Sequence, residues 1–218
     1  MQERRQTQER RRRRNDDDAG PVAAENCTLT IDPGNPFETA FASLSAGDVL
    51  CLNDGTYAQA MDVPAGLHVR AVHDGKAELD GRGTLGTPWS GAVLTLVGED
   101  SSARGLRVHH AGTNSHACQL GGSNNTLRMM SCARGGSYKH KTPLFISGDG
   151  HLVEDSWFFG EGRYVVQCFI GTSVTLRHNV ARWDATTPNE PTEPNAAFSI
   201  YNCSGATDEQ HQFGLRGA

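Results

Sequence analysis

The sequence lacks long apolar runs, paired cysteine motifs and, almost entirely, lysine. No stretch approaches the roughly 18 uninterrupted apolar residues of a membrane helix, so the sequence predicts no such helix. The six cysteines contain no CxxC pair, which argues against a zinc site. Lysine occurs three times, and Lys139 and Lys141 flank His140 in the segment GGSYKHKTPLF. The sequence therefore concentrates its scarce lysines beside a histidine and a tyrosine.

Charge is unevenly distributed along the chain. The 218 residues carry a formal net charge of −5, but residues 1–20 contain seven arginines and five acidic residues. The rest of the chain has 13 basic and 20 acidic side chains. We predict a disordered tail over residues 1–24, because it has too few apolar side chains to form a core. Its arginine run could bind nucleic acid, but we favour a solvated tail; it lacks the apolar segment of a signal peptide.

Two cysteines lie in segments that could be neighbouring strands. Cys27 and Cys51 occur in the runs CTLTI and DVLCL, so a disulfide between them and two free thiols are both open interpretations. We interpret the other four mainly as small core residues; they are Cys118, Cys132, Cys168 and Cys203. The redox compartment is left open by this pattern.

Four segments in the middle of the chain repeat. The aligned segments are LVGEDSSARGLRV, LGGSNNTLRMMSC, ISGDGHLVEDSWF and FIGTSVTLRHNVA. Their glycines, Gly98, Gly122, Gly148 and Gly171, are 24, 26 and 23 residues apart. Each repeat has short apolar strands on both sides of the glycine turn and no helical period. Such repetition predicts a solenoid of β-coils, in which stacking buries the inner face of each coil.

Stacking of the coils should place equivalent residues in ladders along the solenoid. The residues six positions after each glycine form a charged outward ladder of Arg104, Arg128, Glu154 and Arg177. Glu154 then lies between two arginines, and each such pair contributes about 0.2–1 kcal/mol. Two inward ladders are expected, namely Leu96–Leu120–Ile146–Phe169 and Ala103–Leu127–Val153–Leu176. We interpret the charged ladder as structural.

One helix is predicted ahead of the coils, at about residues 35–46. Asn35 can cap it, Pro36 suits its first position, and Glu38 completes a capping box. Its apolar face consists of Phe37, Ala40, Phe41 and Leu44. A helix at this position can cover the open end of a solenoid, whose exposed strand edges would otherwise invite aggregation.

Residues 45–81 resemble the opening of right-handed parallel β-helix proteins of the pectate-lyase-like superfamily. In that group a capping helix is followed by a GD-containing strand, a GTY turn and a strand ending near DG; this sequence has SAGDVLCLNDGTY and then AELDG. The likeness covers about residues 30–203. It implies an all-β parallel β-helix over residues 25–205 and an extracellular or cell-surface protein. It is weak for activity, because the superfamily includes polysaccharide lyases, glycoside hydrolases, sugar epimerases, phage tailspikes and non-catalytic surface proteins.

The C-terminal part of the chain departs from the repeat in two places. A proline-rich insertion at residues 184–195 predicts a long surface loop. Residues 206–218 provide neither a capping helix nor another coil, so we predict an irregular, truncated end. We therefore expect the chain to be the N-terminal part of a longer solenoid, or its last coil to be covered by another chain.

The connections between successive coils should lie on one side of the solenoid. They are roughly residues 109–116, 133–142, 159–165 and 182–196, and they concentrate basic and aromatic side chains in an acidic body. An extended anionic polysaccharide could lie there, with cations holding its carboxylates and rings stacking on its sugars. The substrate-binding candidates are His109, His110, His116, Arg134, Tyr164, Arg182 and Trp183.

If this face is catalytic, β-elimination fits its residue types best. A lyase must neutralise a uronate carboxylate and then remove the neighbouring proton with a base. Lys139, His140 or Lys141 could be the base, Arg163 could neutralise the carboxylate, and Tyr138 could protonate the leaving oxygen. A lysine base would need its pKa lowered by neighbouring cations.

Three alternatives accompany the lyase hypothesis. A non-catalytic adhesin or tailspike-like module would need only aromatic stacking and arginine. A sugar epimerase or a glycoside hydrolase is a further alternative, and the hydrolase ranks below the lyase and the epimerase because the motifs of β-helix polygalacturonases are absent. The resemblance also leaves Ca²⁺ open as a cofactor; the candidate ligands are Glu154, Asp155, Glu161 and Asp184, without calcium-loop spacing.

Overall fold

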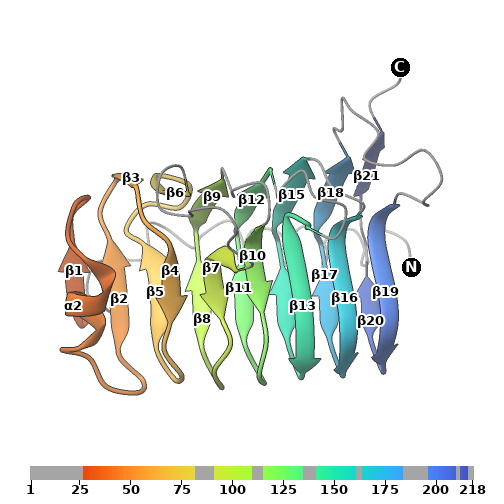
Figure 1. The fold of residues 1–218 in the computed structure, drawn as a ribbon, viewed down its shortest axis with the longest axis horizontal. Coiled ribbons are helices and arrows are strands. Elements are labelled where there is room, and N and C mark those ends of the chain that lie inside the picture. The colour runs from red at the N-terminus through yellow and green to blue at the C-terminus, as the bar shows by residue number, and fades with distance from the viewer. Residues whose placement is uncertain are drawn as a thin grey trace, which may run out of the picture.

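The chain winds into a solenoid of three-stranded coils. The computed structural model describes residues 27–81, 91–109, 115–134, 141–160, 164–183, 196–209 and 212–215. Equivalent strands of neighbouring coils pair in parallel and form three long sheets along the axis (Figure 1). The predicted all-β parallel β-helix is thereby confirmed, while the predicted tail of residues 1–24 lies outside the described residues.

The three sheets are called A, B and C. Sheet A contains, in spatial order, β1 (Leu29–Ile31), β2 (Val49–Leu52), β5 (His68–Ala71), β8 (Ser102–Arg104), β11 (Thr126–Arg128), β14 (Leu152–Glu154), β17 (Thr175–Arg177) and β20 (Thr207–Glu209). Sheet B contains β3 (Gly55–Tyr57), β6 (Ala77–Asp80), β9 (Leu106–His109), β12 (Ser131–Ala133), β15 (Trp157–Gly160), β18 (Val180–Trp183) and β21 (Gln212–Leu215). Sheet C contains β4 (Met61–Val63), β7 (Ala92–Leu96), β10 (His116–Leu120), β13 (Leu144–Asp149), β16 (Tyr164–Thr172) and β19 (Ala196–Ser204).

The core fills the inside of the coils with stacked apolar ladders. The predicted ladder in sheet A is confirmed, since its members pair in register and are buried; they are Ala103, Leu127, Val153 and Leu176. In sheet C, Leu96, Leu120 and Ile146 also stack as predicted. Burial of these side chains is the main driving force that stacks the coils, because a single coil cannot bury its own inner face.

The fourth member of the predicted sheet-C ladder was wrong. Ile146 pairs with Cys168, not with Phe169, and the register between β13 and β16 shifts before the shared glycine position. Strand β16 has one residue more than β13 there, and Ile170 takes a left-handed conformation with φ 59°. A bulge of this kind reverses which side chains face the core. Phe169 consequently points outward and is exposed.

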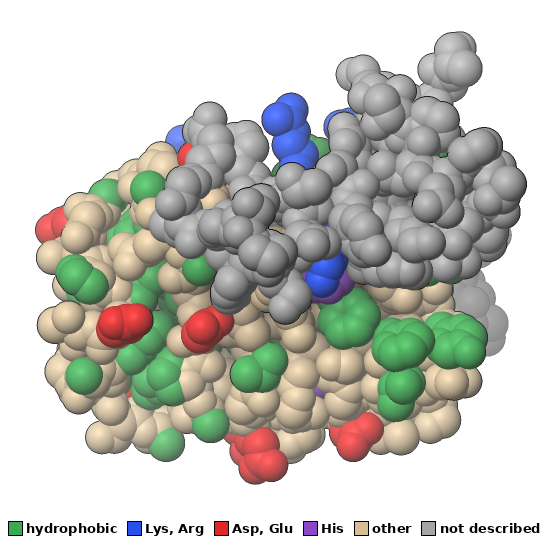
Figure 2. Space-filling model, viewed as in Figure 1, with side chains coloured by type: hydrophobic (Ala, Val, Ile, Leu, Met, Phe, Trp, Pro, Cys, Tyr) green, Lys and Arg blue, Asp and Glu red, His purple; other side chains and the backbone are tan. Residues whose placement is uncertain are grey.

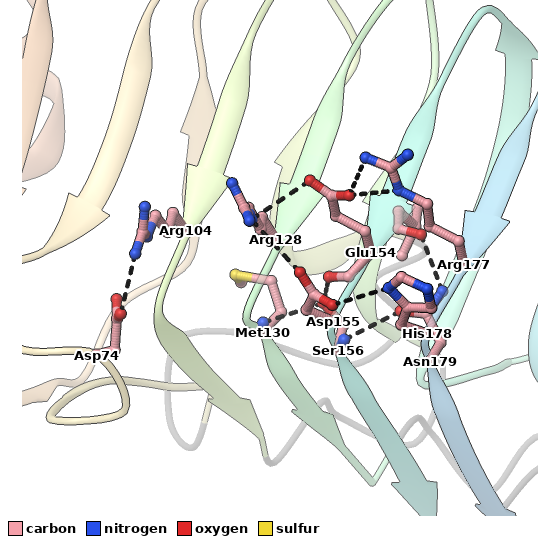
Figure 3. A network of polar contacts seen from close by, with 11 residues as sticks. Asp74, Arg104, Arg128, Met130, Glu154, Asp155, Ser156, Arg177, His178 and Asn179 are labelled. Carbon is pink, nitrogen blue, oxygen red and sulfur yellow. Dashed lines mark hydrogen bonds and ion pairs between the residues drawn. The ribbon is translucent and has the colours of Figure 1, made fainter. Parts of the chain in front are cut away.

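The charged ladder on sheet A has the predicted order. Arg128 Nε lies 3.3 Å from Glu154 Oε1, and Arg177 Nε donates a hydrogen bond of 2.6 Å to Glu154 Oε2 (Figure 3). The two arginines leave Glu154 only 6% exposed, so its carboxylate is largely enclosed between them. Beside it, Asp155 forms ion pairs with Arg128 at 3.5 Å and with His178 at 3.3 Å. Both carboxylates therefore have a structural role in holding coils together.

Glycine is required where the turns of adjacent coils touch. Gly122 has φ +68°, and a Cβ there would lie 2.2 Å from the carbonyl oxygen of Gly98. We expect Gly122→Ala to lower the free energy of unfolding by roughly 2–5 kcal/mol in urea, from backbone strain plus this clash. The matched control is Gly47→Ala, because Gly47 has φ +91° but open space around an added Cβ. Equal losses in the two variants would show that the coil contact is unimportant.

A short helix covers the first coil. Helix α2 (Phe37–Phe41) lies across the N-terminal end of the solenoid (Figure 1). Phe37 and Ala40 are buried, and the Phe37 ring stacks on Tyr57 with centroids 5.6 Å apart, as an apolar capping face requires. The helix is shorter than predicted, and the predicted cap was wrong. Asn35 Oδ1 instead accepts the backbone N–H of Asp32 at 2.9 Å, which closes the preceding turn.

All six cysteines form disulfides. Cys27–Cys51 attaches the start of the described chain to β2, which settles the pairing that the sequence left open. Cys118–Cys132 joins sheets C and B across the interior of one coil, and Cys168–Cys203 links β16 to β19. The interpretation of the last four as mainly core residues was therefore incomplete. No helix in the described ranges is long and apolar enough to cross a membrane.

Candidate functional site

Sheet-B strands end, and the following sheet-C strands begin, along one edge of the solenoid, at the top of Figure 1. Of the predicted site residues, those at the ends of sheet-B strands are His109, Arg134, Arg182 and Trp183. Those at the starts of sheet-C strands are His116, Lys141 and Tyr164. The predicted residues outside the described ranges are His110, Tyr138, Lys139, His140 and Arg163. The single predicted face is thus divided between two sides of this edge.

The outer face of sheet C presents a row of aromatic rings. This aromatic row consists of Phe145, Phe169 and Tyr201, with ring centroids 6.3 and 5.4 Å apart. Hydrophobic side chains gather over β13, β16 and β19 in the space-filling view (Figure 2). Phe169 is 36% and Tyr201 56% exposed, so both present ring surface to solvent. Such a row, running along the axis, is suited to stack against successive sugar rings.

Polar side chains flank the aromatic row. Gln119 and Gln167 pair with Phe145 from the coils on either side of it, and both are half-buried. An amide offers one acceptor and two donors, which match sugar hydroxyl groups. The face therefore combines stacking surface with hydrogen-bonding groups at the spacing of the coils, about 4.8 Å.

The side chain of His116 packs against the first ring of this row. Its ring stacks on Phe145 at 4.8 Å, and its Nδ1 accepts the backbone N–H of Thr142 at 3.1 Å. Burial, followed by the nearby charge of Lys141, lowers the pKa of His116 to about 3. The imidazole is therefore neutral near pH 7, and His116 is better placed to position Phe145 and Thr142 than to attract an anion by charge.

Lys141 lies next to this pair. It directly precedes Thr142 and is half-buried at the entry to β13. Burial lowers the pKa of its ammonium group. The lowered pKa of Lys141 therefore comes from desolvation. The sequence had suggested neighbouring cations as the cause. A lowered pKa makes the neutral amine, the form that can accept a proton, more accessible at this position.

A separate groove of about 250 Å³ lies on the outer face of sheet B. Its lining residues are Glu78, Arg107, Val108, His109, Ser131, Ala133, Arg134 and Phe159. Glu78 contacts two neighbouring side chains, with Oε1 2.7 Å from His109 Nε2 and Oε2 3.7 Å from Arg107 Nη1. The guanidinium of Arg182 lies over the Phe159 ring, 5.5 Å from its centroid. The groove is therefore lined by basic and aromatic groups around one carboxylate.

The candidate calcium ligands that the structure describes do not form a calcium site. Glu154 and Asp155 are occupied by arginines, and Glu161 and Asp184 lie outside the described ranges. The cluster Glu78, Asp80 and His109 brings three ligand atoms within 4.8 Å of one another. However, calcium prefers oxygen ligands, and this group includes an imidazole with Arg107 beside it.

Sequence reasoning missed several residues of both faces. Phe145 could have been found, because Leu144 and Ile146 face the core and strand residues alternate. Phe169 could not, since its direction depends on the bulge in β16. Glu78 and Arg107 lie in coils preceding the lysine segment, and only the register between β6 and β9 brings them to the groove.

Comparison with solved structures shows the fold. The crystal structure of pectate lyase Pel9A is similar, with a TM-score of 0.54 and 14% identity over 86% of this chain and 62% of that chain. Pectin methylesterase PemA from Erwinia chrysanthemi matches with 16% identity over 74% of this chain and 57% of that chain, at a TM-score of 0.46. A PL6 family alginate lyase matches at 0.35, with 12% identity over 90% of this chain and 41% of that chain.

The likeness to the pectate lyase shows that this solenoid has the right-handed parallel β-helix fold. The chain spans less than two thirds of the length of the pectate lyase and of the bacterial methylesterase. No family model and no curated protein matches the sequence.

Proposed function

We propose that this β-helix binds an anionic polysaccharide along the outer face of sheet C and cleaves it by β-elimination, with Lys141 as the base. The observation that carries the proposal is the position of Lys141 at the head of the exposed aromatic row. Burial lowers the pKa of this lysine. The fold is also one on which a pectate lyase is built.

The proposed reaction needs few groups. The neutral amine of Lys141 takes the proton from the carbon next to the uronate carboxylate. The released electron pair forms a carbon–carbon double bond as the bond to the glycosidic oxygen breaks, and this oxygen takes up a proton. Arg163 is proposed to neutralise the carboxylate and Tyr138 to supply that proton, with Lys139 and His140 as the alternative bases; these four lie outside the described residues.

A non-catalytic binding module is the second candidate. The aromatic row favours it, because stacking on sugar rings requires no base. The three disulfides support the proposal of an exported protein for either candidate, since disulfides persist in oxidising compartments.

A lyase screen distinguishes the two candidates. The purified chain is incubated with polygalacturonate, alginate, hyaluronan, chondroitin or heparin, with and without calcium, and the ultraviolet absorbance of new unsaturated ends is followed. We expect the absorbance to rise with one acidic polymer. Binding of a polymer without any rise would reject elimination and support the binding module.

A further inference from the structure

We propose that the groove on sheet B is a second binding site for an acidic sugar, separate from the aromatic row on sheet C. This inference does not depend on Lys141 acting as a base. It rests on a groove of about 250 Å³ in which two guanidinium groups and the Phe159 ring from successive coils meet. Such a site would hold a polysaccharide while another part of the same polymer occupies sheet C.

Two arginines provide the anion-binding groups. The Arg107 side chain is 56% exposed, and Arg134 is also exposed where it lines the groove. A guanidinium presents paired N–H donors that match a carboxylate or a sulfate. Glu78, 3.7 Å from Arg107, orients this arginine from the adjacent coil. The whole chain has a net charge of −5, so the attraction is local to the groove and not a property of the whole surface.

The backbone fixes the position of Arg134. Its N–H donates to the carbonyl oxygen of Phe159 at 2.9 Å, and its φ is 55°. The neighbouring coil contributes Gly160, where an added Cβ would lie 2.7 Å from the Arg134 nitrogen. The absence of a side chain at Gly160 allows the two backbones to approach closely and places Arg134 at the rim of the groove.

An exposed aromatic ring lies beyond the groove, next to one of its lining residues. Ser131 lines the groove and pairs with Arg107 on one side and with Trp157 on the other. The Trp157 side chain is 60% exposed. At about 4.8 Å per coil, Arg107 and Trp157 are separated by roughly 10 Å across a small serine. A stacking ring beside guanidinium groups selects an acidic sugar over a small inorganic anion.

The test measures calorimetric binding of trisaccharides to the full chain carrying Lys141→Ala, so that no turnover occurs. The probes are trigalacturonate, a mannuronate trimer, a sulfated heparin trisaccharide and neutral cellotriose. We expect an acidic trimer to bind at two sites. Arg134→Gln or Trp157→Ala should weaken one of them by about 10-fold, while Lys76→Gln, at an exposed position in the turn before β6, should change neither.

Variants on sheet C separate this inference from the proposed function. Tyr201→Ala should weaken the other site and leave the sheet-B site intact. Binding at a single site that Arg134→Gln weakens and Tyr201→Ala leaves unchanged would reject the proposed function but not this inference. Unchanged isotherms with Arg134→Gln and Trp157→Ala, or no binding of any acidic trimer, would overturn the inference. Tighter binding of oligothymidylate than of every sugar would assign the groove to single-stranded nucleic acid and also overturn it.

Discussion

Replacing Lys141 by alanine should reduce the rate of β-elimination by about 10²–10⁴-fold, the range that a positioned general base contributes. Lys141 is half-buried at the entry to β13, and burial lowers the pKa of its ammonium group. More of the side chain is then in the neutral form that can accept a proton. The measurement is the initial rise in ultraviolet absorbance on the polymer that the screen identifies.

Two further variants decide what the loss means. Lys141→Arg keeps the positive charge but cannot act as a base near neutral pH, so it should bind the polymer while losing the rate. Lys76→Ala removes an exposed lysine in the turn before β6 and should leave the rate unchanged. Retention of most activity in Lys141→Ala would assign the base to another residue, with Lys139 and His140 the next to replace. Elimination restored by Lys141→Arg would show that this lysine only attracts the polymer.

Acidification from pH 7 to pH 5 should lower the free energy of unfolding by about 2 kcal/mol through His116 alone. The pKa of this histidine falls from an ordinary 6.5 to about 3 in the folded chain, first because of burial and then because of Lys141. The unfolded chain therefore binds more protons between these values. The stability contribution is complete above pH 6.5 and is lost progressively as the pH falls toward 3. Urea unfolding at several pH values measures it.

A second buried histidine acts in the same direction. Burial lowers the pKa of His151, whose Nδ1 accepts the N–H of Asn125 at 3.1 Å and whose Nε2 lies 2.9 Å from the carbonyl oxygen of Ser147. This hydrogen bonding identifies it as a turn residue of the solenoid. His116→Gln should remove about 2 kcal/mol of the pH dependence, and the same replacement of the exposed His73 is the matched control. Equal pH dependence in the His116 variant and the parent chain would contradict this assignment.

Much of the fold could be predicted from the repeat. The constant six-residue offset from glycine to charge implies that Arg128, Glu154 and Arg177 stack, and the structure confirms it. The same offset placed Leu127 and Val153 in one buried ladder. Such predictions succeed because coil stacking converts a sequence period directly into spatial neighbours.

The candidate site could be predicted only in part. Lys141 attracted attention because lysine is rare. Its neighbour His116 lies in the preceding coil, however, so the sequence alone could not show that the two residues meet or that Lys141 is half-buried. Phe169 was placed in the core because the repeat alignment cannot detect a one-residue bulge. Because strand residues alternate between the two faces, the extra residue in β16 moves Phe169 from the core to the outer face. The aromatic row exists only because of this shift.

The sequence by itself determined the solenoid, the order of its sheet-A ladders and the presence of a helical cap, because each follows from local periodicity. Only the tertiary structure decided the pairing of Cys118 with Cys132, the outward direction of Phe169 and the meeting of Glu78 with His109. These contacts depend on the register and closure of particular coils. Register is a property of neighbouring strands together, and no single repeat contains it.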